Sequence, residues 1–94
     1  MPGRARRDRA RRRGDGLHRR EEALIALAID NDPARAVALA RANFDVQREP
    51  ADARVLAAAG RAARDAAALR VVEDWQRATG LEDVALARLL GSRS

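Results

Sequence analysis

The sequence predicts an all-α fold in which antiparallel helical hairpins stack as a short solenoid of about five helices, preceded by an Arg-rich arm or helix. Two observations predict this fold. Apolar residues recur at helical spacing along most of the chain, and no segment alternates with the period of two that is typical of a half-buried strand. An acidic residue also returns about every seventeen positions, each time before an apolar stretch. These residues are Asp15, Asp32, Glu49, Asp65 and Glu82.

The acidic residues suit the starts of helices. A carboxylate before the first turn accepts hydrogen bonds from unpaired N–H groups and lies at the positive end of the helix dipole. Pro is tolerated in that first turn, and the two near-identical segments Asp32-Pro33-Ala34 and Glu49-Pro50-Ala51 both have this pattern. Two steps make a helix–turn–helix unit of about thirty-four residues.

The first two helices are expected over residues 17–29 and 33–47, separated by the turn 30–32. Asp32 is the expected N-cap of the second helix, with Pro33 at its first position. The apolar face of the first helix comprises Leu17, Leu24, Ile25 and Ala28. The apolar stripe of the second comprises Val37, Ala40 and Phe44, widened by Ala36, Leu39 and Val46.

The next helix is expected over residues 50–63, and a tight turn at Arg64-Asp65 separates it from a helix that ends at Thr79-Gly80. A shorter fifth helix is expected over 82–90. The apolar residues of the third helix are Val55, Leu56, Ala59, Ala62 and Ala63. Those of the fourth and fifth helices are Ala68, Val71, Val72, Trp75, Leu86, Leu89 and Leu90. Trp75 and Phe44 lie within these stripes and are therefore expected to pack in the core, whereas Asn43 is expected at the surface or on a peptide backbone.

The 94 residues allow one domain, over 17–90, between the Arg-rich segment 1–16 and a frayed tail 91–94. Charge is unevenly distributed along the chain. Residues 1–20 hold nine Arg against two acids, which gives +7, whereas residues 21–94 hold ten Arg against twelve acids, which gives −2. The basic charge therefore lies in the N-terminal segment, and all of it is Arg because the chain has no Lys. Such a composition indicates either phosphate binding or the codon bias of a GC-rich genome.

Several function classes are excluded by composition. There is no Cys for a disulfide or thiolate metal site, and no apolar run approaches the roughly twenty residues of a membrane span. Without the apolar stretch of a secretory signal, a cytoplasmic location is expected by default. His18 lies beside Arg19 and Arg20, where a solvated or capping role is expected, and no Gly-rich phosphate loop follows a strand. We therefore expect no enzyme activity, no catalytic residue, no metal and no cofactor.

Residues 17–90 resemble the tetratricopeptide repeat family. Ala59-Gly60 falls where the family has its small pair, Trp75 and Ala78 fall on its helix B aromatic and the following Ala, and Pro50 closes the first unit. Glu22 and Leu56 replace large aromatic residues, Asp45 replaces an Ala, and the second unit has no closing Pro. The resemblance implies a TPR-like protein–protein interaction scaffold of roughly two and a half units. Such a chain is expected to form homo-oligomers or to be completed by neighbouring repeats of a longer array.

The resemblance also implies where a partner binds. In this family the first helix of each hairpin lines a concave groove, which places Ala23, Leu27 and Asp30 there together with the candidate groove residues. These candidates are Arg20, Arg54, Ala57, Arg61 and Arg64. A guanidinium group binds a carboxylate through two parallel hydrogen bonds, so an acidic peptide is the expected partner. A solvated helix face is the alternative, and the Lys clamp that the family uses for C-terminal carboxylates is absent.

Two other functions stay open at this stage. The N-terminal arginines offer weak, sequence-independent contacts with nucleic acid, because no aromatic residue lies among them to stack on bases. The candidate nucleic-acid contacts are Arg4, Arg6, Arg7, Arg9, Arg11, Arg12 and Arg13. The chain could also be a truncated gene product without an independent function.

Overall fold

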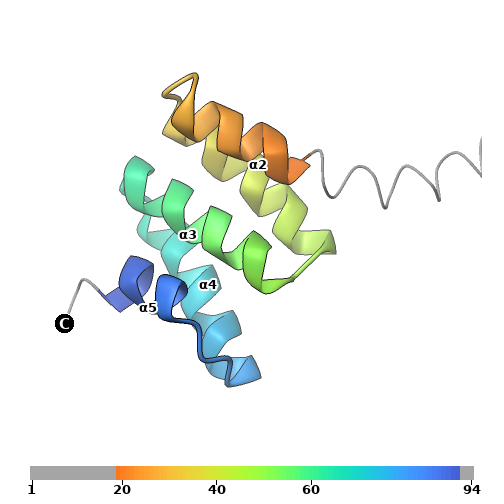
Figure 1. The fold of residues 1–94 in the computed structure, drawn as a ribbon, viewed down its shortest axis with the longest axis vertical. Coiled ribbons are helices and arrows are strands. Elements are labelled where there is room, and N and C mark those ends of the chain that lie inside the picture. The colour runs from red at the N-terminus through yellow and green to blue at the C-terminus, as the bar shows by residue number, and fades with distance from the viewer. Residues whose placement is uncertain (1–18, 92–94) are drawn as a thin grey trace, which may run out of the picture.

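The computed structural model describes residues 19–91, which form five helices joined by short links (Figure 1). The first helix covers residues 19–28. It is followed by α2 (Pro33–Val46), α3 (Pro50–Ala63), α4 (Ala66–Thr79) and α5 (Val84–Gly91). No strand occurs among residues 19–91, and the all-α fold class is confirmed. The TPR-like stacking stays a prediction, and the expectations for residues 1–18, including the Arg-rich segment and His18, lie outside the described residues.

Local sequence explains where the helices begin. The Asp32 carboxylate accepts a hydrogen bond from the backbone N–H of Arg35 at 3.2 Å, and the Asp65 carboxylate accepts one from Ala68 at 3.1 Å. Both residues are the predicted N-caps. The start of α5 differs from the prediction by one residue, because Asp83 rather than Glu82 accepts the hydrogen bond from the backbone of Leu86 at 2.8 Å.

The first helix, α3 and α4 are followed by residues with left-handed backbone conformations, whereas α2 is followed by Gln47, which has an extended backbone. Asn31, Arg64 and Gly80 have φ values of 50°, 55° and 68°. At the end of α3, the N–H of Asp65 donates to the carbonyl of Gly60 at 2.8 Å and the N–H of Arg64 donates to that of Arg61 at 3.2 Å, the pairing of a Schellman motif. Gly adopts a left-handed conformation without steric cost, whereas Arg64 adopts it at a steric cost because it has a side chain.

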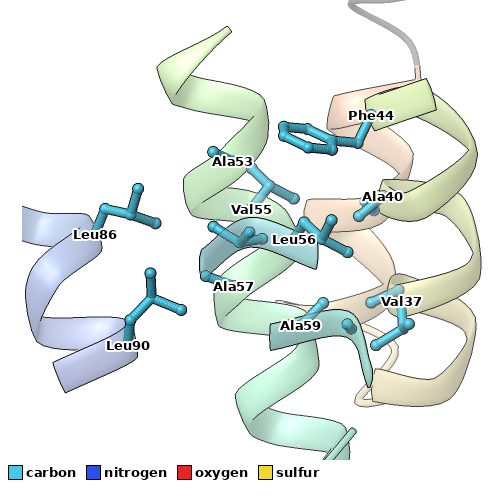
Figure 2. Close-up of a cluster of buried hydrophobic side chains, with 14 of the residues drawn as sticks. Val37, Ala40, Phe44, Ala53, Val55, Leu56, Ala57, Ala59, Leu86 and Leu90 are labelled. Atoms are coloured by element: carbon cyan, nitrogen blue, oxygen red, sulfur yellow. The ribbon is translucent and has the colours of Figure 1, made fainter. Parts of the chain in front are cut away.

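α3 is the central helix of the fold, and α2, α4 and α5 all pack against it. It contributes more buried apolar residues than any other described helix, namely Ala53, Val55, Leu56, Ala57 and Ala59, and Figure 2 shows them among the side chains of α2 and α5. Gly60 permits close packing with α4, because a Cβ at this position would lie 3.1 Å from the Cβ of Ala68. This close approach offsets the roughly 1 kcal/mol that Gly costs inside a helix.

The two aromatic residues join α2 to α4. The rings of Phe44 and Trp75 make an edge-to-face contact with their centroids 5.6 Å apart, and the predicted core packing of both is confirmed. The stripe of α2 is buried as predicted at Val37, Ala40 and Phe44, but Val46 is exposed near the end of the helix.

The prediction for the first helix was wrong about which face is buried. Leu24, Ile25 and Ala28 are exposed, whereas Ala23 and Ala26 are buried. Ala side chains permit a close approach between helices, so this helix packs through its small residues. Leu24 and Ile25 consequently face outward, whereas Leu27 is partly buried against the core.

Candidate functional site

The candidate site is one face of α3. Arg54, Ala57 and Arg61 lie on this face, because steps of three and seven residues complete about one and two helical turns. We call these three residues the Arg face. α5 packs against it: Ala57 is buried, and Leu86 and Leu90 of α5 belong to the same buried cluster. Figure 2 shows both leucine side chains pointing from α5 toward α3. The face of α3 that was predicted to bind a peptide is therefore covered by α5.

An ion pair fixes the N-terminal end of α5 on the Arg face. The Nη1 atom of Arg54 lies 2.7 Å from Oδ2 of Asp83, while Oδ1 of the same carboxylate caps α5. The side chain of Asp83 is 12 % exposed and that of Arg54 is 42 % exposed. One carboxylate therefore both begins the helix and binds it to α3, in a position that solvent still reaches.

Arg61 and Arg64 lie near the other end of this face. The guanidinium of Arg61 donates to the backbone carbonyl of Arg88 at 3.2 Å, so it binds a carbonyl in the last turn of α5. Such carbonyls carry the partial negative charge of a helix C-terminus, which a guanidinium complements. Arg64 is exposed at the turn after α3, and it forms no hydrogen bond or ion pair with α5 among the described residues.

Arg20 does not join the Arg face, and the prediction that grouped them in one groove needs correction. Its Nε atom lies 2.9 Å from Oδ1 of Asp52 and its Nη2 atom lies 3.6 Å from Glu49. Asp52 precedes Arg54 by two positions, which puts the two on nearly opposite sides of α3 at 100° per residue. Arg20 therefore fastens the first helix to α3. Ala23 is buried rather than exposed on a groove floor.

Asp52 is the centre of a buried polar network that the sequence did not reveal. Its Oδ1 atom accepts a hydrogen bond from Nδ2 of Asn43 at 2.8 Å, and its Oδ2 atom accepts one from the backbone N–H of Glu49 at 3.2 Å. The Nε–H of Arg20 is not directed at the carboxylate, so its close contact is an ion pair and not a hydrogen bond. The network joins the first helix, α2 and α3.

Asn43 was expected at the surface, and this expectation was wrong. The residue is 1 % exposed. The spacing does indicate burial, since Asn43 follows Ala36 by seven residues and Ala40 by three on the buried face of α2. A polar residue on such a face requires a hydrogen-bond partner, which Asp52 supplies.

The described residues contain neither a candidate metal site nor a membrane-spanning helix. Among residues 19–91, no group of three or more His, Cys, Asp or Glu side chains could hold a metal ion. None of the helices in that range has both the length and the apolar character needed to cross a membrane. The candidate nucleic-acid contacts between Arg4 and Arg13 lie outside the described residues. Comparison with protein-family models, with curated proteins and with solved structures finds no match to this chain.

Proposed function

We propose that this chain is a non-enzymatic, TPR-like protein-interaction domain that binds an acidic, amphipathic helical peptide on the Arg face of α3. The observation that supports this proposal is the way α5 is held. Arg54 binds a carboxylate, Arg61 binds a carbonyl near the end of the helix, and two Leu side chains pack where Ala57 leaves room. A peptide with the same groups in the same order meets the same partners.

The chemistry of the Arg face sets the requirements for the partner. Arg54 and Arg61 are seven residues apart, which spans about 10 Å along α3 at 1.5 Å per residue. In α5 the corresponding groups are the Asp83 carboxylate, the carbonyl of Arg88 and the side chains of Leu86 and Leu90. The partner is therefore a helix of two or three turns that begins at an Asp and has apolar residues three and seven positions later.

Peptide binding tests this proposal. The probe is a fluorescein-labelled peptide with the sequence of residues 82–91, titrated with the full chain and followed by fluorescence anisotropy. We expect saturable binding that weakens at high salt, because the Debye screening length falls to about 3 Å at 1 M ionic strength.

Two variants of the full chain make the test specific. Both are made in the Asp83→Asn chain, in which α5 has already lost its ion pair with Arg54. In that chain Arg54→Gln removes the charge that binds the peptide carboxylate and is expected to weaken binding about fivefold, equivalent to about 1 kcal/mol. Arg70→Gln is the matched control, since Arg70 is exposed on α4. Equal affinity of the two variants, or no binding to any form of the chain, would contradict the proposed function.

A further inference from the structure

We infer that α5 is a displaceable internal ligand, which keeps the Arg face closed until an acidic helical segment of a partner takes its place. This inference rests on the proposed function and adds how access to the face is regulated. The chemistry of the Arg face defines which segment can replace α5. The competing segment has a carboxylate for Arg54, a carbonyl for Arg61 and two apolar side chains spaced like Leu86 and Leu90.

α5 can leave without disturbing the end of α4. That end is closed by its own residues: the N–H of Gly80 donates to the carbonyl of Gln76 at 2.9 Å, and the hydroxyl of Thr79 donates to the carbonyl of Trp75 at 2.9 Å. Gly80 also supplies the left-handed conformation that terminates a helix. The structure of α4 therefore does not depend on the docking of α5.

The rest of the core also persists without α5. α5 contributes Leu86 and Leu90 to the buried residues of the described cluster. The first helix, α2, α3 and α4 supply the other buried residues. α5 has eight residues, well below the roughly 12–15 at which an isolated helix becomes marginally stable in water. Its helical form thus depends on docking, and undocking is an order-to-disorder step of one short segment.

The ion pair is accessible to a competitor. The Arg54 side chain is 42 % exposed while it binds Asp83, so an incoming carboxylate can reach the guanidinium before α5 has left. The apparent dissociation constant of a partner equals its intrinsic value divided by the fraction of chains with an open face. A change that weakens the docking of α5 without altering the Arg face therefore tightens partner binding by the factor by which it raises the open fraction.

Asp83→Asn weakens the docking of α5 with little effect on its helix. Asn is as good an N-cap as Asp, so the capping of α5 is kept while the charge that binds Arg54 is lost. The expected result is that the labelled 82–91 peptide binds the Asp83→Asn chain about fivefold more tightly than the wild-type chain, equivalent to about 1 kcal/mol. Glu82→Gln is the matched control, because Glu82 is an exposed neighbouring acid, and it should leave the affinity unchanged.

Hydrogen exchange gives a second, independent measurement on the full chain. Unlabelled peptide is added to isotope-labelled wild-type chain, and the amides of Leu86 and Leu90 are expected to exchange faster as the peptide saturates. If the peptide binds the wild-type, Asp83→Asn and Glu82→Gln chains equally, still depends on Arg54 and leaves this exchange unchanged, the inference fails while the proposed function stands. If the peptide binds none of the chains, Asp83→Asn included, both fail.

Discussion

Replacing Asp52 with Ala is expected to destabilise the fold more than any other single carboxylate change among the described residues. Two donors lose their acceptor, the Asn43 side chain and the Glu49 backbone, and the Arg20 guanidinium loses its ion pair. They differ in how they can recover. The side chain of Arg20 is 19 % exposed and can turn to water or to Glu49, whereas Asn43 is 1 % exposed and cannot.

The magnitude follows from these differences. A buried amide left without a partner costs about 1–3 kcal/mol, and a lost helix cap costs about 1 kcal/mol. Because Arg20 regains solvent, its ion pair adds little, and the expected total is about 2–4 kcal/mol. A domain of this size is stable by only about 5–10 kcal/mol, so this change removes a large part of its stability.

Urea unfolding measures this effect, with helical circular dichroism and the fluorescence of Trp75, the one Trp in the chain, as probes. With a slope of about 1 kcal/mol per M, the midpoint should fall by about 2–4 M. Asp45→Ala is the matched control, since Asp45 is exposed on α2 and its loss should change stability by less than about 0.5 kcal/mol. If Asp52→Ala is no more destabilising than Asp45→Ala, then Asp52 does not organise the three helices.

Three further changes test the local geometry by thermal or urea unfolding. Arg64→Gly should stabilise the chain by about 1 kcal/mol, because Gly adopts a φ of 55° without strain; a loss of stability would argue against the left-handed turn. Gly60→Val should destabilise by at least about 2 kcal/mol, since even a Cβ would lie 3.1 Å from that of Ala68, and a neutral result would mean that α3 and α4 are farther apart. Asp65→Ala should cost about 1 kcal/mol through loss of the α4 cap, whereas Asp65→Asn should restore most of it.

The helix starts could be predicted because they depend on neighbouring residues. A carboxylate two or three positions before an N–H reaches it whatever the rest of the chain does, and so Asp32 and Asp65 were identified as caps. The same locality explains why a helix over residues 50–63 necessarily brings Arg54, Ala57 and Arg61 onto one face. Residues within two turns of one another have a relative position that the helix itself determines.

Contacts between distant segments could not be predicted in this way. Arg54 and Asp83 are 29 positions apart, and nothing in their local sequence indicates that they meet. The first helix shows a related failure. Its predicted face followed the helical spacing of the apolar residues around Leu24 and Ile25, but the structure buries Ala23 and Ala26, because small residues allow the closest helix packing. Side-chain size alone therefore selects the wrong face in a chain this rich in Ala.

The buried network around Asp52 could not be predicted for a different reason. Asn43 was expected at the surface or on a peptide backbone, and the family resemblance placed Arg20 in the groove. Each instead contacts Asp52, Asn43 through a hydrogen bond and Arg20 through an ion pair. A polar residue on a buried helical face can be recognised from sequence, but its partner on another helix cannot.

The contact between Arg54 and Asp83 is the interaction on which the proposed binding face depends, and a double-mutant cycle measures it directly. Hydrogen exchange of the α5 amides gives the free energy of opening for the wild-type chain, Arg54→Gln, Asp83→Asn and the double variant. We predict a coupling energy of about 0.5–1 kcal/mol that decreases at 1 M salt. Additive effects with no coupling would show that the Arg face does not hold α5, and would contradict both the binding face and its regulation.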